Sequence, residues 1–334
     1  MYELASLAVG RGGRRRALYV RGFRAAMWQG PGMPSHAPPA LADGGIETTL
    51  TCHEGFRLPW FAAFPLVSER GGREAIARYF DGFLELAGLR GLPFVLDTVT
   101  WRANPDWGTR LGYDTAALAA ANREAVSLAR ALAARGDRVT VNGVVGPRGE
   151  GYAVSERMSA DEAADYHAAQ IATLSSAGAE RITALTLTYA EEAIGIVQAA
   201  AACSVPVVIS FTVETDGRLP DGTPIAAAID QVDAATSAAA EFFMLNCAHP
   251  THIAAGLTDA PSLHRIGGLR PNASALSHAE LDASDDLDQG DPVLLARDNA
   301  ALRARLPSIR LLGGCCGTDL RHITEIVSAW QNGR

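Results

Sequence analysis

Short apolar runs alternate with longer alanine-rich segments from residue 40 to the end of the chain. Each run is bounded by turn residues, which is typical of buried strands. The eight runs lie near residues 40–43, 93–97, 138–145, 181–187, 206–213, 242–247, 263–269 and 309–314.

The segments between these runs have the composition and length of helices. They lie near residues 72–90, 115–135, 159–178, 190–202, 223–240, 250–257, 292–305 and 319–331. Ser159 and Glu162 form a capping box at one helix start, and Gly178 is a suitable stop for the same helix. Strands that alternate with helices predict a parallel sheet. Eight such units favour a single (β/α)8 TIM barrel, of the α/β class, over a doubly wound sheet, because no Gly-x-Gly-x-x-Gly follows the first strand.

Residues 1–39 differ from the rest of the chain. They are rich in arginine and glycine and then carry four prolines, without any hydrophobic period. A nucleic-acid-binding arm and a targeting peptide are two alternatives. The lack of periodicity favours a flexible N-terminal extension, followed by a catalytic barrel over residues 40–334.

Composition narrows the class of protein. The 334 residues include 29 basic and 37 acidic side chains, a net charge of −8, which argues against a general nucleic-acid or membrane-surface role. The sequence contains no lysine, so Schiff-base catalysis is excluded. No apolar stretch reaches the length of about 18 residues that a membrane span needs. Five cysteines do not make a disulfide framework in a chain of this size, and no signal-peptide core is visible. We therefore expect a cytoplasmic protein.

A TIM barrel places its catalytic groups at the carboxyl ends of the strands. Polar residues and glycines gather at these positions. The predicted strand ends carry Asp43–Glu47, Thr100–Asn104, Gly146–Pro147, Thr186–Tyr189, Glu214–Gly217, Asn246–Cys247, Arg270–Asn272 and Gly314–Cys316.

Three cysteines at two of these ends suggest a metal site. Neighbours on a regular strand point to opposite faces, so Cys315 and Cys316 can bind one ion only where the strand breaks, and the flanking glycines allow that. Together with Cys247 they predict a Zn²⁺ ion bound by three sulfurs, with one position left open for chemistry. A vicinal disulfide and inert packing are the alternatives. Asn246, beside Cys247, is expected to orient that cysteine or the substrate.

The remaining histidine and cysteine candidates are weaker. His249 and His252 have the spacing of a metal-ligand pair, but Pro250 indicates a helix start there. Cys52 and Cys203 are expected to be small buried hydrophobic residues.

Three thiolates make an anionic zinc site, which is poorly suited to generating hydroxide but well suited to deprotonating an incoming thiol. Such a thiolate attacks an activated methyl group, a reaction that needs positioning rather than a base at carbon. The alternatives are a zinc hydrolase and a non-enzymatic protein with a structural or redox-sensing zinc site.

A set of motifs, in order along residues 40–331, resembles the zinc-dependent homocysteine S-methyltransferases. The motifs are Asp43-Gly44-Gly45, Thr100-x-x-Ala103, Gly146-Pro147, Asn246-Cys247, Pro271-Asn272 and Gly313-Gly314-Cys315-Cys316-Gly317. The resemblance implies a (β/α)8 barrel, zinc on the three cysteines, and methylation of homocysteine to methionine. It also implies that Asp43, Gly44 and the adjacent Gly45 hold the amino-acid end of homocysteine.

The chain departs from this family at the end of its fourth strand. Relatives usually carry a glutamate there for the substrate ammonium, whereas this chain has no carboxylate between Leu185 and Ala190. Glu47 and Glu214 are the candidate replacements, although Glu214 is equally suited to capping a turn. Thr186 is placed in the same predicted substrate site. The acceptor is therefore homocysteine or another thiol, with a corrinoid-linked acceptor as a further alternative.

The methyl donor is expected to be a small cation. The chain shows no second domain for cobalamin or folate, which leaves a sulfonium such as S-methylmethionine or S-adenosylmethionine, or a quaternary ammonium such as betaine. Aromatic faces stabilise such cations. The candidates are Trp60, Trp101, Trp107 and Tyr189, and ordinary packing is the alternative for each.

The acidic segment 277–291 is attributed to a solvated face, with attraction of the donor as the alternative. The expected partners are a small thiol and a methyl donor, without nucleic acid or membrane. The sequence leaves open whether the chain forms a homo-oligomer.

Overall fold

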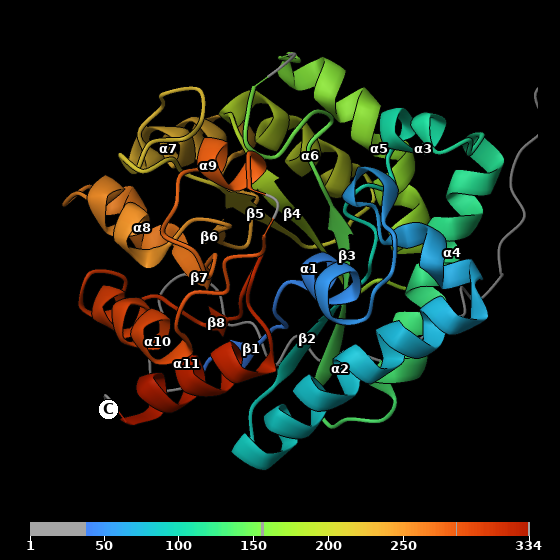
Figure 1. Ribbon diagram of the computed structural model, residues 1–334. Coiled ribbons are helices and arrows are strands. Elements are labelled where there is room, and N and C mark those ends of the chain that lie inside the picture. The colour runs from blue at the N-terminus through green and yellow to red at the C-terminus, as the bar shows by residue number, and fades with distance from the viewer. Residues whose placement is uncertain (1–37, 155–156, 285, 333–334) are drawn as a thin grey trace, which may run out of the picture. The chain divides into compact units, whose positions relative to one another are not determined.

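The computed structural model describes residues 38–154, 157–284 and 286–332, all of which belong to one compact unit, Ser35–Arg334. Within these residues, eight parallel strands form a closed barrel in sequence order, and helices surround it (Figure 1). The strands are β1 (Ala40–Leu41), β2 (Phe94–Asp97), β3 (Val139–Val145), β4 (Arg181–Leu187), β5 (Val207–Phe211), β6 (Phe243–Asn246), β7 (Ile266–Arg270) and β8 (Leu311–Leu312).

The predicted (β/α)8 TIM barrel is confirmed. A long helix follows most strands, and short helices lie in the loops at the carboxyl ends of the strands. The helices are α1 (Ile46–Thr48), α2 (Arg70–Arg90), α3 (Pro105–Arg110), α4 (Thr115–Ala133), α5 (Ala160–Ala177), α6 (Ala190–Ala202), α7 (Ile225–Thr236), α8 (Pro250–Gly256), α9 (His278–Asp282), α10 (Pro292–Ala301) and α11 (Leu320–Asn332). None of the helices in the described ranges combines the length and apolar character that crossing a membrane requires.

Local sequence signals account for both ends of α5. The capping box of Ser159 and Glu162 is present at the start of α5, and Gly178 ends that helix in the left-handed conformation, with φ 106°. The prediction of a strand from residue 263 was wrong, because Pro261–Arg265 forms a 3₁₀ turn and β7 starts only at Ile266. The short helices α1, α3 and α9 were not predicted, since each is too brief to show a hydrophobic period. The predicted extension lies, apart from residues 38 and 39, outside the described residues.

The two strands that close the barrel are short. β1 and β8 pair over only two residues each, Ala40 with Leu311 and Leu41 with Leu312. The buried guanidinium of Arg270, at the end of β7, reinforces this closure. It forms ion pairs with Asp43 after β1 and Asp97 on β2, and its Nε donates to the Gly314 carbonyl oxygen at 3.0 Å.

Helices α5 and α6 pack against each other through Gly195. A Cβ atom at this position would lie 2.5 Å from the Ala160 carbonyl oxygen and 2.5 Å from the Ala163 Cβ. Real atoms do not approach so closely, so the absence of a side chain allows the two helices to touch. Gly88, which is exposed on α2, has nothing within 4 Å of the same position.

Replacing each of these two glycines by alanine should change the free energy of unfolding in opposite directions. Gly195→Ala should lower the free energy of unfolding by about 1–3 kcal/mol, because the added methyl group forces α5 and α6 apart. Gly88→Ala should raise it by up to about 1 kcal/mol, since alanine has the higher helix propensity and meets no neighbour. Urea unfolding followed by circular dichroism measures both. Stabilisation by Gly195→Ala would contradict the close contact.

Candidate active site

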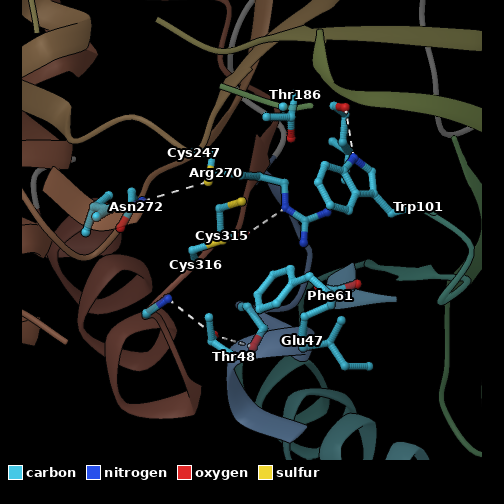
Figure 2. A pocket seen from close by; sticks show the side chains of 18 of the residues that line it. Glu47, Thr48, Phe61, Trp101, Thr186, Cys247, Arg270, Asn272, Cys315 and Cys316 are labelled. Atoms are coloured by element: carbon cyan, nitrogen blue, oxygen red, sulfur yellow. Dashed lines mark hydrogen bonds between the residues drawn. The ribbon is translucent and has the colours of Figure 1, made fainter. Parts of the chain in front are cut away.

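A cavity of about 620 Å³ opens at the carboxyl ends of the strands. It is lined by residues from seven of the eight strand ends and the loops that follow them, and Figure 2 labels ten of these residues. Nine sequence-predicted site residues line it, namely Asp43, Gly44, Gly45, Glu47, Trp101, Thr186, Cys247, Cys315 and Cys316. Asn246 lies behind this wall, fully buried, and Glu214 is not part of the lining.

The three predicted zinc ligands converge on one wall of the cavity, beside Arg270 (Figure 2). The Sγ atoms of Cys247, Cys315 and Cys316 all lie within 4.8 Å of one another. Three sulfurs bound to zinc at about 2.3 Å in a tetrahedron lie about 3.8 Å apart, so only a small contraction would close this cluster on an ion. The residues present therefore fit a three-thiolate zinc site. All five cysteines of the chain are free thiols, and the alternative of a vicinal disulfide is not observed.

The backbone turns these thiols inward at two irregular points. Cys247 has φ 55°, a left-handed conformation that non-glycine residues rarely adopt. β8 ends at Leu312, so Cys315 and Cys316 are free of the strand alternation that would separate their side chains. Gly317, with φ 75°, completes that turn. Strain at a residue that carries a functional side chain is common at reactive sites.

The three thiols of the cluster differ in the direction of their pKa shifts. Hydrogen bonds from Cys247 and Cys316 hold the pKa of the Cys315 thiol well below its usual range, and Arg270 adds to this effect. The same contacts, together with burial, raise the pKa of Cys247 and of Cys316. Cys315 is therefore the thiolate that the protein fold itself stabilises.

Asn246 connects three strands to this thiolate. Its Oδ1 accepts from the Thr186 backbone N–H at 2.9 Å and from the Ser210 hydroxyl at 2.6 Å. Its Nδ2 donates to the Thr186 Oγ1 at 2.8 Å and to the Cys315 Sγ at 3.7 Å. All its hydrogen-bonding capacity is used, so Asn246 fixes the position of the thiol, and the Thr186 hydroxyl is engaged as well.

Tyr152 is a site residue that the sequence analysis missed. Its hydroxyl lies 3.0 Å from the Cys247 Sγ and 3.7 Å from the Cys316 Sγ. Its ring stacks on His278, with 4.0 Å between ring centroids. Tyr152 comes seven positions after the end of β3, in a glycine-rich loop, so no spacing relates it to the cysteines. The sequence held one sign of its role, because Tyr152 is the one aromatic residue between β3 and α5.

The two candidate glutamates occupy different positions. Glu214 pairs with the His278 Nδ1 at 3.0 Å, and the His278 Nε2 lies 3.0 Å from the Cys247 carbonyl oxygen. Glu214 thus supports the residue on which Tyr152 stacks. Glu47, on α1, lines the cavity and has no hydrogen bond to another residue among those described. Burial raises the pKa of Glu47 to about 7, with the nearby Cys315 and Asp43 contributing.

Asp43 is held inside the barrel. Besides Arg270, it accepts from the Tyr79 hydroxyl at 3.1 Å, and burial raises its pKa to about 7 despite the opposing charge of Arg270. The next residues approach the cysteine loop closely, since a Cβ on Gly45 would lie 2.6 Å from the Cys315 carbonyl oxygen. Glycine is therefore required at this contact.

Aromatic residues also line the cavity, and Figure 2 shows Trp101 across from the cysteines. Trp60, Trp101 and Trp107 line the cavity, whereas Tyr189 does not, and its hydroxyl accepts from the Met158 backbone N–H at 3.0 Å. The Trp101 indole N–H donates to the Leu185 carbonyl oxygen at 3.2 Å, at the strand end that lacks the glutamate.

The remaining candidates fall outside the cluster. His249 caps α8, as the proline after it suggested, and the His252 Nε2 lies 3.0 Å from the Ala275 carbonyl oxygen. The prediction that Cys52 is buried was wrong, because it is exposed at the cavity edge, on a π-helical turn. Cys203 is half-buried at the end of α6.

Comparison with known proteins agrees with this geometry. Two solved structures of the homocysteine methyltransferase MmuM from Escherichia coli are similar to the chain, one of a metallated form (23% identity, TM-score 0.67) and one of an oxidized form (22% identity, TM-score 0.69). Each alignment covers 88% of this chain and 96% of the other, and shows the same fold. A comparison with curated protein sequences gives no match. A family model described as homocysteine S-methyltransferase matches residues 40–330. The chain therefore belongs to the homocysteine S-methyltransferase family.

Proposed function

We propose that the protein is a zinc-dependent S-methyltransferase that moves a methyl group from a small cationic donor to the thiol of homocysteine. The observation that carries this proposal is the convergence of Cys247, Cys315 and Cys316 within 4.8 Å at the wall of a 620 Å³ cavity. Cys247, Cys315 and Cys316 would hold the ion, and the similar MmuM has been described in a metallated form. Zinc, when bound, lowers the pKa of a thiol ligand and so supplies a thiolate nucleophile at neutral pH.

Family membership supports homocysteine as the acceptor, and the cavity offers groups for its amino-acid end. Glu47 is a half-buried carboxylate without a side-chain partner among the described residues, and a poorly solvated carboxylate of this kind favours a ligand cation such as an ammonium group. Asp43 already pairs with Arg270, so its part is to hold the loop of Gly44 and Gly45 in place. Glu47 thus takes the role of the carboxylate that is missing at the end of β4.

The charges of the cavity support a cationic donor. Seven carboxylates line it, against two guanidinium groups, those of Arg102 and Arg270. The carboxylates are those of Asp43, Glu47, Asp97, Glu150, Asp282, Asp286 and Asp288. This excess of negative charge raises the local concentration of cations. Three of the six acidic residues of the segment 277–291, Asp282, Asp286 and Asp288, belong to the lining, which favours the donor-attracting alternative over a purely solvated face.

The reaction makes few demands on the protein besides positioning. A bond forms between the acceptor sulfur and the methyl carbon, and the bond from that carbon to the donor sulfur or nitrogen breaks. The electron pair leaves with the donor, which becomes a neutral thioether or tertiary amine. Asn246, Tyr152 and Asn272, whose Nδ2 lies 3.8 Å from the Cys247 Sγ, hold the cysteine sulfurs in place. The cytoplasmic location stays a prediction from the sequence, which leaves the oligomeric state open.

Removing one thiol tests the metal site. Cys247→Ser, Cys315→Ser and Cys316→Ser should each abolish stoichiometric zinc binding and lower methyl transfer by more than about 100-fold, because two sulfurs do not hold the ion. Metal analysis and methionine formation measure both effects. Cys203→Ser, at the end of α6, is the matched control and should retain zinc and activity. Full activity after exhaustive chelation would refute the zinc requirement.

The role of Glu47 is tested by comparing acceptors. Glu47→Gln should raise the KM for homocysteine by about 10- to 100-fold, through the loss of one charge-assisted hydrogen bond, and leave the KM for 4-mercaptobutyrate, which is homocysteine without its amino group, unaffected. Glu214→Gln should alter both acceptors alike, because Glu214 acts only through His278. Steady-state kinetics with both thiols distinguish the two glutamates, and equal losses on both thiols for Glu47→Gln would contradict its assignment.

The raised pKa of Glu47 predicts a pH-dependent stability difference. Between the pKa of Glu47 in the unfolded chain, about 4.3, and its folded value of about 7, the folded state binds more protons than the unfolded state. The contribution of Glu47 to the free energy of unfolding therefore falls as pH rises. Below about pH 4 the group is neutral in both states and contributes nothing. Glu47→Gln should therefore gain stability relative to the wild type from pH 4.5 to 8. Urea unfolding of the two zinc-free proteins across this pH range measures the difference. If the stability difference between them did not change with pH, the raised pKa of Glu47 would be contradicted.

A further inference from the structure

Arg102 differs from the other arginine of the cavity in how far its charge is neutralised. Arg270 uses both terminal nitrogens on buried carboxylates, those of Asp43 and Asp97, and its Nε on the Gly314 carbonyl oxygen. Arg102 is equally buried, at 7% exposure, but pairs with a single carboxylate, that of Glu150 at 2.6 Å. Its second terminal nitrogen donates to the Gly149 carbonyl oxygen at 3.2 Å, and its Nε has no hydrogen-bond partner within the described part of the chain.

Two indole rings hold this guanidinium in place. Its central carbon lies 4.5 Å from the centroid of the Trp101 ring and 3.7 Å from that of the Trp107 ring. These are the aromatic faces that the sequence offered for a cationic donor, and the arginine already occupies them. A donor cation would meet a fixed positive charge here. The rings therefore prepare Arg102 to receive an anion rather than a cation.

A ligand carboxylate can take the place of Glu150 beside Arg102 with little loss of folding stability. The Glu150 side chain is 53% exposed, and an ion pair with a solvated partner contributes little to stability. A ligand carboxylate that replaced Glu150 would release that side chain to water. It would gain a charge-assisted contact with a guanidinium that two rings keep in one orientation.

The position of Arg102 relates this anion site to the reaction. Arg102 and the three cysteines line the same cavity, and the arginine lies over the Trp101 ring, which Figure 2 shows across the cavity from the thiols. Glu47, the carboxylate proposed for the ammonium group of the acceptor, lines the same cavity, so the acceptor already has its own charged partner. The anion that Arg102 receives therefore belongs to the second substrate.

We propose that Arg102 binds the carboxylate of the methyl donor and so selects, among compounds with an onium methyl group, those that also carry a carboxylate. This inference rests on the proposed methyl transfer and assigns a residue to the carboxylate that S-methylmethionine, S-adenosylmethionine and betaine share. The acceptor thiol loses its proton to solvent, its sulfur bonds to the methyl carbon, and the onium bond breaks. The donor leaves as a neutral thioether or tertiary amine, still bound at Arg102 by its carboxylate.

Donors that differ only in the carboxylate test the proposal. S-methylmethionine and glycine betaine are each compared with their primary amides, which keep the onium group and remove the negative charge. For at least one onium class, the wild-type protein should prefer the carboxylate form by about tenfold or more, both in kcat/KM and in calorimetric binding without acceptor. Binding without turnover would separate a failure of the methyl-transfer hypothesis from a failure of the anion site.

Substitution of the arginine completes the experiment. Arg102→Gln should reduce the preference for the carboxylate form to less than about threefold, and Arg102→Lys, which keeps the charge, should retain part of it. Arg110→Gln is the matched control, because Arg110 lies over the same Trp107 ring, at 4.3 Å, but is not part of the cavity lining. If neither carboxylate donor is preferred by the wild type, or if Arg102→Gln keeps the preference, the proposal is overturned.

Discussion

The ion-pair network of Arg270 joins the closure of the barrel to the geometry of the site. Its guanidinium reaches from β7 to Asp43 after β1, to Asp97 on β2, and to the Gly314 carbonyl oxygen after β8. Since β1 and β8 pair over two residues each, this network adds side-chain contacts to a short backbone seam. A buried arginine between two buried carboxylates is stable only as a complete set, because removing one partner leaves an uncompensated charge.

The same network determines where the reacting groups lie. Gly314 immediately precedes Cys315, and Asp43 immediately precedes the glycines that touch the cysteine loop. Arg270 also lowers the pKa of Cys315, so that it stabilises the thiolate electrostatically as well as through the backbone. The Arg270 side chain thereby links the loop after β1 to the segment that carries Cys315, and a backbone hydrogen bond from Gly314 N–H to the Asp43 carbonyl oxygen joins the same two segments.

Behind the cysteines lies a second layer of polar support. Asn246 holds Cys315, and Tyr152 faces Cys247 while stacking on His278, which Glu214 orients in turn. Such second-layer contacts fix the direction of ligand side chains and tune their basicity. They explain why polar residues as far from the cavity as Glu214 belong to the functional unit without lining it.

Much of this protein follows from its sequence. The alternation of apolar runs with helical segments determined the barrel, because burial of one face imposes a period that can be read without coordinates. The same pattern located Cys247, Cys315 and Cys316 at strand ends, and parallel strands bring such ends together. Glycines around the cysteine pair also indicated that the strand breaks there.

The tertiary structure alone decided which side chains complete the site. Glu47 rather than Glu214 lines the cavity, and Tyr152 faces the thiols. Arg102 covers the indole rings of Trp101 and Trp107, which were candidates for binding the donor cation. Each of these facts depends on loop conformation and on contacts between residues far apart in the chain, such as the 95 positions between Tyr152 and Cys247. Hydrophobic periodicity records only which face of an element is buried, so it carries no information about where an irregular loop directs a side chain.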